Sequence, residues 1–288
     1  MEMTVMRRPT PAAGEVLIRV AAIGVNPADA KWRMGMFAQR VPVAFPYIPG
    51  YDVAGTIEAG GTLAAGTRVL VMLDNLKAGA YAQFVVAAEH AVAQIPDGLD
   101  DATAAALPTP ALTGVQIIEE HVRPGVHDRV LITGATGAVG RFAVHAAKSR
   151  GAHVIAAVRA EQRQTALAIG ADETLVLGEE LGRALVLDHI VDTVGGPAVA
   201  ALCRHVRPGG SIKTVATTPI SADGLAIVPE FVAVHPDGHR LATIARWVAA
   251  GTVVVAVAQR LALGEAGRAH RYLEAGSVGG KIILDPWQ

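Results

Sequence analysis

Apolar residues are arranged differently in the first part of the chain and in its middle. Up to about residue 108, short apolar segments are separated by turns that contain glycine. This spacing is typical of a small β-barrel whose strands follow one another directly. The expected strands of this part are 15–23, 51–57, 67–72 and 81–86.

From about residue 109, apolar strands alternate with helical segments. That alternation predicts an α/β arrangement, a doubly wound parallel sheet with helices on its faces. Near the C-terminus the pattern changes again, to an amphipathic helix over 261–275 and a closing strand over 280–284. The strands expected in the middle of the chain are 130–133, 153–158, 174–177, 189–193 and 211–215.

The turn after the strand at 130–133 carries the clearest chemical motif of the chain. Backbone N–H groups at the start of the helix that follows would bind a pyrophosphate, and missing side chains would let it approach closely. In the usual G-x-G-x-x-G pattern, Ala135 replaces the first glycine and Gly134 beside it supplies flexibility. The strand at 153–158 completes a Rossmann-type βαβ unit, which favours a dinucleotide site over a glycine-rich packing turn. The expected cofactor contacts in the turn are Gly134, Ala135, Thr136, Gly137, Ala138, Val139 and Gly140.

The residue that closes the second strand of this unit indicates which dinucleotide is bound. Sites for NAD carry an acid there, which bonds the ribose 2′-OH. This chain has Arg159 instead, with Arg163 one helical turn further on. Because a guanidinium pairs bidentately with a phosphate, we expect NADP(H) as the cofactor. The alternative is an exposed arginine at the end of a strand.

Composition excludes several classes of partner and site. The net charge is −1, which gives a nucleic acid or an acidic membrane surface no electrostatic attraction. No apolar run is long enough to span a membrane, residues 1–8 lack a secretion-signal pattern, and we expect a cytoplasmic protein. The single cysteine, Cys203, allows no internal disulfide, and its apolar helical surroundings predict an inert packing residue. We expect no metal site, because His235 and His239 are separated by proline and glycine and cannot share a helix face.

The order of motifs along almost the whole chain resembles the zinc-independent quinone oxidoreductase branch of the medium-chain dehydrogenase/reductase superfamily. The resemblance implies a GroES-like β-barrel domain formed from both termini around a central Rossmann domain, and often a homodimer. The corresponding boundaries are 1–108 for the N-terminal part of the catalytic domain, 109–235 for the NADP-binding domain, and 236–288 for a C-terminal segment that partly returns to the catalytic domain. The matching stretches are 14–19, 24–29, 48–55, 79–84, 95–98, 105–108 with 112–113, 134–140, 191–196, 207–210, 269–276 and 280–284.

The resemblance also suggests residues that contact the substrate or the cofactor. Asn26 stands where zinc-dependent relatives have a cysteine ligand, and Tyr51 stands where they have a histidine, so both are candidate catalytic residues. Thr113 and Lys281 resemble a threonine and a terminal lysine near the family's cofactor. Each has a structural alternative: an N-cap before Pro27 for Asn26, a buried tyrosine with a structural hydrogen bond for Tyr51, a helix cap for Thr113 and a solvated side chain for Lys281.

Further candidate residues are two dipeptides at the ends of expected strands, one acid and two aromatic side chains. Val194-Gly195 and Val215-Ala216 end strands at the carboxyl edge of the sheet, where cofactors bind in open α/β folds. Asp52 is expected to be a buried partner of a nearby cation. Trp32 and Tyr47 are expected either to wall the substrate pocket or to anchor the core.

These observations predict an NADPH-dependent oxidoreductase that transfers hydride to a quinone or an α,β-unsaturated carbonyl without a metal. The chain shows no obvious catalytic acid, so we expect a proton from solvent. The alternatives are an enoyl-thioester reductase and a non-catalytic NADPH-binding sensor or scaffold. The sequence before residue 14 and the segment 57–68 are shorter than usual for the family, which predicts an altered substrate entrance.

Overall fold

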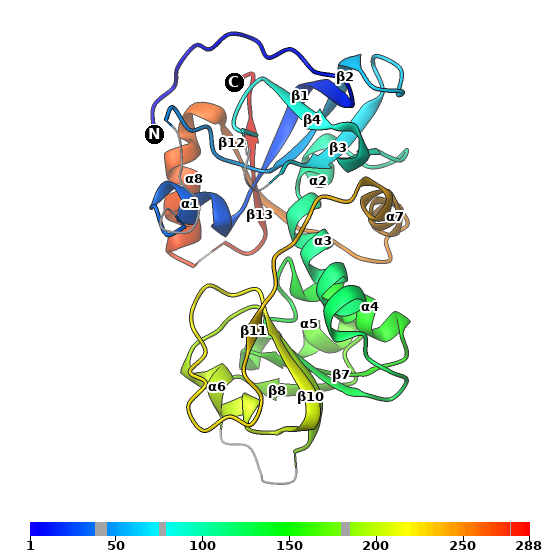
Figure 1. Cartoon of the computed structure of the whole chain (residues 1–288), viewed down its shortest axis with the longest axis vertical. Coiled ribbons are helices and arrows are strands. Elements are labelled where there is room, and N and C mark those ends of the chain that lie inside the picture. The colour runs from blue at the N-terminus through cyan, green and yellow to red at the C-terminus, as the bar shows by residue number, and fades with distance from the viewer. Residues whose placement is uncertain (38–44, 75–78, 180–184, 277) are drawn as a thin grey trace. The chain divides into compact units, whose positions relative to one another are not determined.

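The computed structural model describes residues 1–37, 45–74, 79–179, 185–276 and 278–288, which form two compact units. Unit 1 combines Met1–Leu112 with His235–Gln288, and unit 2 is Thr113–Val234 (Figure 1). The two ends of the chain therefore fold together, and the middle of the chain folds as a separate body.

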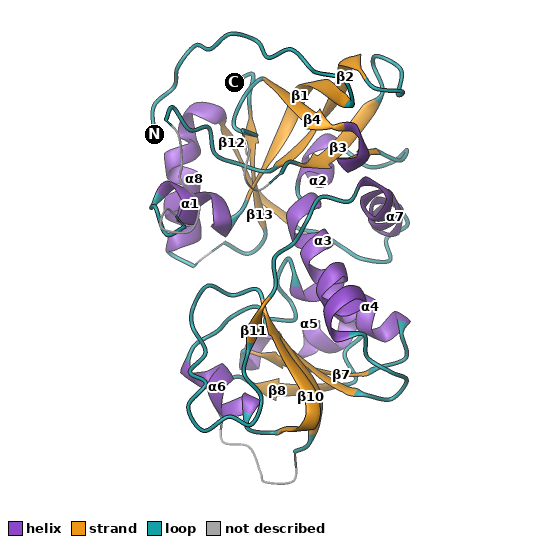
Figure 2. Ribbon diagram, in the orientation of Figure 1, coloured by secondary structure: helices purple, strands orange, loops and turns teal. Residues whose placement is uncertain are grey.

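Unit 1 is built on a sheet of seven strands in the described part of the chain (Figure 2). The strand order is β12-β13-β1-β2-β3-β5, and β4 pairs with β1 beside this path. The antiparallel pairing and the glycine turns agree with the expected GroES-like barrel. The strands are β1 (Glu15–Val25), β2 (Asp52–Gly60), β3 (Arg68–Met72), β4 (Phe84–Ala88), β5 (Val92–Gln94), β12 (Val257–Ala262) and β13 (Lys281–Asp285).

The C-terminal strand completes this sheet by pairing with the first strand. β13 runs antiparallel to β1, with Ile23 opposite Leu284 and Val25 opposite Ile282. Ile23, Ile282 and Leu284 are buried in one apolar core. The pairing therefore brings the start of β13 to the end of β1, where α1 begins.

The helix expected over 261–275 begins later than predicted. Residues up to Ala262 belong to β12, Leu263–Glu265 form a 3₁₀ turn, and the helix α8 spans Ala266–Glu274. β12 pairs in parallel with β13, so a partner distant in the sequence decides the conformation of these residues. The other helices that lie wholly in unit 1 are α1 (Pro27–Arg33), α2 (Asp101–Ala105) and α7 (Gly238–Ala249).

Unit 2 is a six-stranded parallel sheet in the described residues, with the order β11-β10-β9-β6-β7-β8. The chain winds from β6 through β7 to β8, and then continues on the other side of β6 with β9, which makes the doubly wound Rossmann arrangement. Its strands are β6 (Arg129–Thr133), β7 (His153–Val158), β8 (Glu173–Val176), β9 (Leu187–Asp192), β10 (Val206–Thr214) and β11 (Glu230–Phe231).

Helices connect the parallel strands of unit 2. α4 packs against β6 and β7, α5 against β7 and β8, and α6 against β10. Cys203 ends α6 and lies in the apolar core of this unit, where burial raises the pKa of its thiol to about 12. The expected packing role of Cys203 is thus confirmed. The helices are α3 (Pro108–Gln116), which continues from unit 1 into a π-helical segment (Ile117–Val122), α4 (Gly140–Ser149), α5 (Arg163–Ala168) and α6 (Pro197–Cys203).

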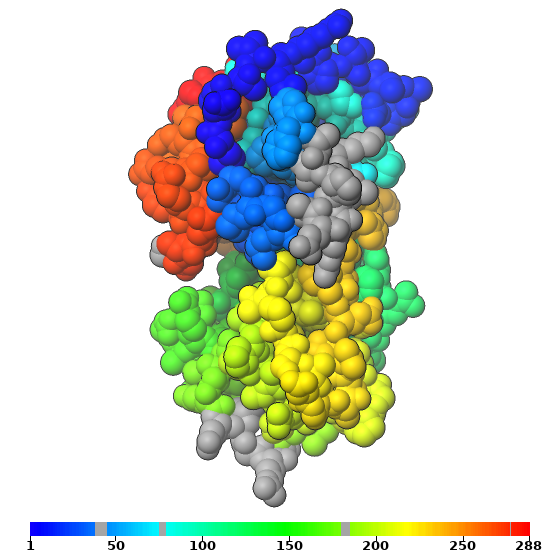
Figure 3. Space-filling model, turned by 60° about the vertical axis from the view of Figure 1, so that its left-hand side comes forward, coloured from blue at the N-terminus to red at the C-terminus, as the bar shows by residue number. Residues whose placement is uncertain are grey.

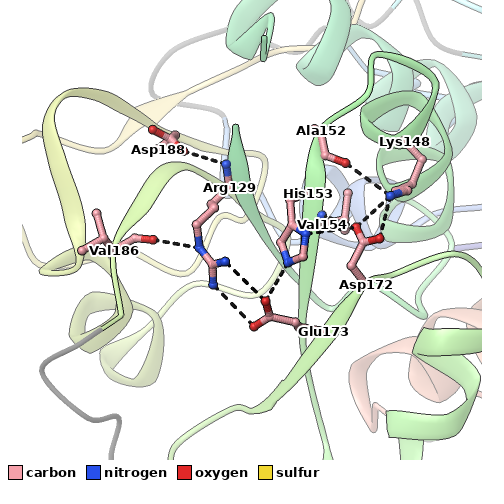
Figure 4. A network of polar contacts seen from close by, with 9 residues as sticks. All are labelled: Arg129, Lys148, Ala152, His153, Val154, Asp172, Glu173, Val186 and Asp188. Carbon is pink, nitrogen blue, oxygen red and sulfur yellow. Dashed lines mark hydrogen bonds and ion pairs between the residues drawn. The ribbon is translucent and has the colours of Figure 1, made fainter. Parts of the chain in front are cut away.

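Ion pairs join the amino-terminal ends of the strands in unit 2 (Figure 4). Arg129 at the start of β6 lies 3.3 Å from Glu173 at the start of β8, and the same carboxylate lies 2.6 Å from His153 of β7. Lys148 of α4 contacts Asp172 at 2.7 Å. These ion pairs lie at the edge of the sheet opposite the glycine turn. They therefore do not occupy the carboxyl edge, where the cofactor is expected.

The first eleven residues have no helix or strand and run along the outside of unit 1 (Figure 3). Arg8 anchors this segment, because its guanidinium lies 2.9 Å from Glu58 and 4.1 Å from the centre of the Phe84 ring. Among the helices of the described residues, none has the length and apolar character needed to cross a membrane.

Candidate functional site

The carboxyl edge of the unit 2 sheet gathers most of the predicted cofactor residues. The glycine turn follows β6, and Arg159 follows β7 directly. Val194 and Gly195 come just after β9, and Val215 and Ala216 come just after β10. β6 and β9 are the neighbours at which the winding direction changes, which is where open α/β sheets bind ligands.

The glycine turn is severely crowded at two of its glycines and less crowded at the third. Gly134 has φ +59°, a left-handed conformation that favours glycine, and a Cβ there would lie 2.5 Å from Thr193 Oγ1. A Cβ on Gly140 would lie 2.3 Å from the carbonyl oxygen of Gly134. A Cβ on Gly137 would meet only that oxygen, at 3.1 Å. Gly140 is therefore required for packing, whereas Gly137 leaves space where a phosphate would approach.

A buried carboxylate that the sequence analysis did not single out holds the strand ends in place. Asp192 ends β9 and is fully buried. Its oxygens accept hydrogen bonds at 2.6 Å from the hydroxyls of Thr133 on β6 and Thr214 on β10. The backbone N–H groups of Val194 and Gly195 also donate to it. Asp192 thus fixes the backbone of three strand ends at the predicted binding edge, and an acid at the end of an apolar strand was the signal for it.

The two arginines predicted to select the cofactor lie on the surface at this edge. The Arg159 side chain is 70% exposed and lies 3.2 Å from an equally exposed carboxylate, Glu161. An ion pair between two exposed side chains is weak, so the Arg159 guanidinium is able to leave Glu161 for a phosphate group. Arg163 donates to Thr174 Oγ1 at 3.0 Å.

Thr113 is buried within α3 rather than at its start, which contradicts the alternative of a helix cap.

In unit 1, Asn26, Asp52 and Lys281 form a buried polar cluster. Asn26 Nδ2 donates to Asp52 Oδ2 at 2.8 Å, and Lys281 Nζ donates to Asn26 Oδ1 at 2.5 Å. Lys281 Nζ also lies 3.6 Å from Asp52 Oδ2. The other carboxylate oxygen of Asp52 accepts from the backbone N–H and the hydroxyl of Thr109. Burial raises the pKa of Asp52 and lowers that of Lys281, and each charge opposes the shift of the other.

This cluster decides between several alternatives. Asp52 is the buried partner of a cation, as expected. Lys281 is only 6% exposed, so the solvated alternative is wrong. Asn26 does precede α1 with Pro27 at the first helical position, but its side chain makes no capping bond and points to Asp52 and Lys281 instead. Asn26 is thus the N-cap residue of α1 through its backbone, whose N–H donates to Asp29, while its side chain bonds Asp52 and Lys281. Its contact with substrate stays a prediction.

A second line of polar contacts starts at Asp29 in α1. Asp29 Oδ2 accepts from the backbone N–H of Asn26 at 2.8 Å and from the Tyr81 hydroxyl at 3.0 Å. The Tyr81 hydroxyl lies 2.9 Å from His270 Nε2, and Arg33 Nε donates to His270 Nδ1 at 3.1 Å. Burial lowers the pKa of His270 to about 4, so its ring is neutral near neutral pH. Because Arg33 donates to Nδ1, the neutral ring carries its hydrogen on Nε2 and donates to Tyr81.

Tyr51 is 2% exposed and lies just before β2. Within the described residues, its hydroxyl and that of Tyr47 are buried and make no hydrogen bond of normal geometry. Burial raises the pKa of both hydroxyls, and so does the charge of Asp29. Trp32 lies against Tyr47, with ring centres 6.2 Å apart. The Tyr51 side chain is therefore buried, as the structural alternative requires, but its hydroxyl makes no structural hydrogen bond of normal geometry with the described residues.

The described residues contain no group of three or more histidine, cysteine, aspartate or glutamate side chains placed to hold a metal. In the cluster around Asn26, the donors are an amide, a lysine and hydroxyls, and the carboxylate of Asp52 already has partners. These groups suit hydrogen bonding to an oxygen rather than coordination of zinc.

Comparison with known proteins agrees with this architecture. Residues 12–97 match the alcohol dehydrogenase GroES-like domain family, and residues 140–284 match the zinc-binding dehydrogenase family. A chloroplast envelope quinone oxidoreductase homolog of Arabidopsis thaliana is 29% identical over 96% of this chain and 92% of its own length. Human quinone oxidoreductase is 35% identical over 54% of this chain and 47% of its own length.

Solved structures share the fold over nearly the whole chain. The quinone oxidoreductase of Coxiella burnetii has a TM-score of 0.82 and 25% identity, with 97% of this chain and 93% of that one covered. A mycobacterial protein complexed with NADPH also has a TM-score of 0.82, with 25% identity and 98% and 94% coverage. The fold and motifs define a medium-chain dehydrogenase/reductase. The chain belongs to the zinc-independent quinone oxidoreductase branch of that superfamily.

The buried pair of Asp52 and Lys281 makes a prediction about stability. Asp52→Asn or Lys281→Met leaves one buried charge without its partner, so each should lower the free energy of unfolding by about 3–5 kcal/mol. The double variant should lose clearly less than the sum of the two. Urea unfolding of all four proteins measures this coupling. The exposed pair Arg8 and Glu58 is the control, since Arg8→Met and Glu58→Gln should couple by less than about 1 kcal/mol. Additive losses at Asp52 and Lys281 would contradict the pairing.

Proposed function

We propose that the protein is an NADPH-dependent oxidoreductase that transfers hydride to a quinone or an α,β-unsaturated carbonyl. One observation carries the proposal: at the switch point of the Rossmann sheet, the turn leaves space at Gly137, and the second strand ends in Arg159 rather than an acid. Quinone oxidoreductases among the relatives, and the mycobacterial protein complexed with NADPH, support it.

The residues of the carboxyl edge fit this cofactor. The pyrophosphate would lie over Gly137 at the start of α4, where backbone N–H groups face it. Arg159 and Arg163 would hold the 2′-phosphate, and the strand-end segments after β9 and β10 would contact the rest of the dinucleotide. When bound, the nicotinamide supplies the hydride.

The side chains available in unit 1 suit a reduction that needs no metal. Hydride addition to a quinone or an enone leaves negative charge on an oxygen, and hydrogen-bond donors fixed in a water-poor site stabilise that charge. We assign this role to the Asn26 amide and the Tyr51 hydroxyl, which are both buried. Asn26 keeps its orientation through Asp52 and Lys281, so Lys281 acts on the site through Asn26.

Two alternatives remain distinct from this proposal. An enoyl-thioester reductase would use the same cofactor edge with a different acceptor, and a non-catalytic sensor would bind NADPH without turnover. A homodimer and a cytoplasmic location also stay predictions; the plant relatives are described as chloroplast proteins.

A panel of acceptors tests the function directly. We expect purified protein to oxidise NADPH with 1,4-benzoquinone, 9,10-phenanthrenequinone, an enal or an enone, and to be slower with NADH. Loss of NADPH absorbance measures the rate, and heat-treated protein is the control. Activity with crotonyl-CoA alone would favour the thioester reductase. Tight NADPH binding without any turnover would favour the sensor.

Arg159→Ala tests the choice of cofactor. A charge-assisted hydrogen bond contributes about 1.5–3 kcal/mol, so the dissociation constant of NADPH should rise on the order of 10- to 100-fold while that of NADH changes little. Isothermal titration with both cofactors measures the two constants. Glu161→Ala, which removes the exposed partner of Arg159, is the matched control and should not weaken NADPH binding. Equal losses for NADPH and NADH would refute the assignment.

The two glycines of the turn should respond differently to the same substitution. Gly137→Val should lose much less stability than Gly140→Val, since its Cβ would meet a single backbone oxygen at 3.1 Å, and it should lose NADPH binding because the side chain fills space that a phosphate would need. Gly140→Val should instead destabilise the protein, because its Cβ would overlap the backbone of Gly134 and Ala135. Thermal unfolding and NADPH titration separate these effects. A Gly137→Val protein with unchanged NADPH affinity would show that the pyrophosphate binds elsewhere.

A further inference from the structure

Arg141 is a charged side chain at an unfavourable position, the first turn of α4. The helix begins at Gly140, so Arg141 is its second residue, and its first turn contains no acid. The amino-terminal end of a helix carries a partial positive charge, which favours a carboxylate there and disfavours an arginine. Arg141 is also partly buried, and burial lowers the pKa of its guanidinium. A positive charge at this position therefore calls for an explanation.

The guanidinium of Arg141 reaches back to the glycine turn that precedes its own helix. Arg141 Nη2 donates to the carbonyl oxygen of Thr136 at 2.8 Å, and Nε makes a longer contact, 3.4 Å, with that of Gly137. The backbone N–H of Arg141 donates to the same Gly137 oxygen at 3.2 Å. Arg141 thus contacts the peptide groups on both sides of Gly137, the glycine at which a Cβ would meet only one atom.

These contacts decide which way the N–H groups of the turn point. A trans peptide group directs its C=O and its N–H in opposite directions. The peptide between Thr136 and Gly137 is held at both ends, because its N–H donates to the oxygen of Gly134 at 2.9 Å. The next peptide has its oxygen toward Arg141, so the N–H of Ala138 points away from the guanidinium.

Three N–H groups of the turn are available to an anion. In the described part of the chain, those of Ala138, Val139 and Gly140 have no hydrogen-bond partner. Free N–H groups at the start of a helix are the donors to which a phosphate binds. Arg141 therefore lies on the carbonyl side of the turn that we propose as the pyrophosphate site.

We propose that Arg141 is a further determinant of cofactor affinity: it holds the carbonyl oxygens of the glycine turn away from the pyrophosphate, and it places a positive charge behind the N–H groups that bind it. The inference rests on the proposed function, in which the pyrophosphate lies over Gly137. Arg141 acts through the turn, so it is a positioning residue. Because NADPH and NADH share the pyrophosphate, Arg141 contributes equally to the binding of both, unlike Arg159.

The unfavourable position of Arg141 in the free protein and its benefit in the complex have one origin. In the free protein the guanidinium lies at the positive end of the helix. A bound pyrophosphate is negative and reverses the electrostatic environment of the same charge. Removing the charge should therefore affect the complex more than the free protein, whereas an arginine with only a packing role would show the reverse.

Arg141→Gln is the central test, because glutamine keeps an amide donor but lacks the charge. We expect the dissociation constants of NADPH and NADH to rise by the same factor, on the order of 10-fold, the lower end of what a charge-assisted hydrogen bond contributes. Isothermal titration measures both constants. The melting temperature of the free protein should stay within about 2 °C of the wild-type value.

Two further measurements separate the charge of Arg141 from its shape. Arg141→Lys keeps the charge, so it should recover part of the affinity that Arg141→Gln loses. The difference in NADPH affinity between the wild type and Arg141→Gln should also shrink in concentrated sodium chloride, because salt screens the charge. A side chain with only a packing role would respond to neither change.

Arg150→Gln is the matched control. Arg150 directly follows the last residue of α4 and, like Arg141, donates to a backbone carbonyl oxygen, that of Pro124 at 3.1 Å. It lies at the opposite end of the helix from the glycine turn. Arg150→Gln should therefore leave both dissociation constants unchanged.

The outcomes separate this inference from the proposed function. Unchanged dissociation constants in Arg141→Gln, or a loss confined to NADPH, would overturn the role of Arg141 and leave the function intact. A large fall in the melting temperature of Arg141→Gln with no recovery of affinity in Arg141→Lys would also overturn it. Equal losses for both cofactors, in a protein that turns over no acceptor, would support Arg141 and overturn the reductase. A wild type that binds neither cofactor would overturn both.

Discussion

The ion pair between Asp52 and Lys281 is the interaction on which the arrangement of unit 1 depends. Removing two charges from water costs several kcal/mol for each ion, and only close pairing with further hydrogen bonds offsets that cost. Here the offset comes from Asn26 and Thr109. The pair also joins β2 to β13, so the polar cluster requires that the C-terminal strand lie beside β1. The same polar contacts therefore fix both the position of the C-terminal strand and the orientation of the Asn26 side chain.

Unit 2 uses a carboxylate for a similar purpose, but with neutral donors. Asp192 binds two threonine hydroxyls and two backbone N–H groups, and these come from the ends of three parallel strands. Hydroxyl and amide donors around a buried charge hold positions without a second ion to desolvate. The glycine turn depends on this frame, because Thr193 packs where a side chain on Gly134 would lie. The glycine turn, which we propose as the phosphate site, therefore depends on strand ends that Asp192 holds in place.

The parts of the structure that sequence patterns predicted are the local ones. The turn at Gly134–Gly140 and the strand at His153–Val158 depend on residues close in the sequence, and both lie where expected. The residues before Ala266 were assigned to a helix because their pattern also suits one face of a helix; the pairing of β12 with β13 overrides it. The partners of Asp192 and Asp29 could not be identified from the sequence, because they lie up to 59 positions away for Asp192 and 52 for Asp29.

Asp29 and Asp52 show how one small domain holds two buried carboxyl groups with different partners. The two share Asn26: its backbone N–H binds Asp29, and its side chain binds Asp52. Burial raises the pKa of both carboxyl groups. Lys281, Thr109 and Asn26 oppose the rise at Asp52, and the Asn26 N–H, Lys281 and the Tyr81 hydroxyl oppose it at Asp29. Asn26 therefore couples the two carboxyl groups, and a change at either carboxyl group should be felt by the other.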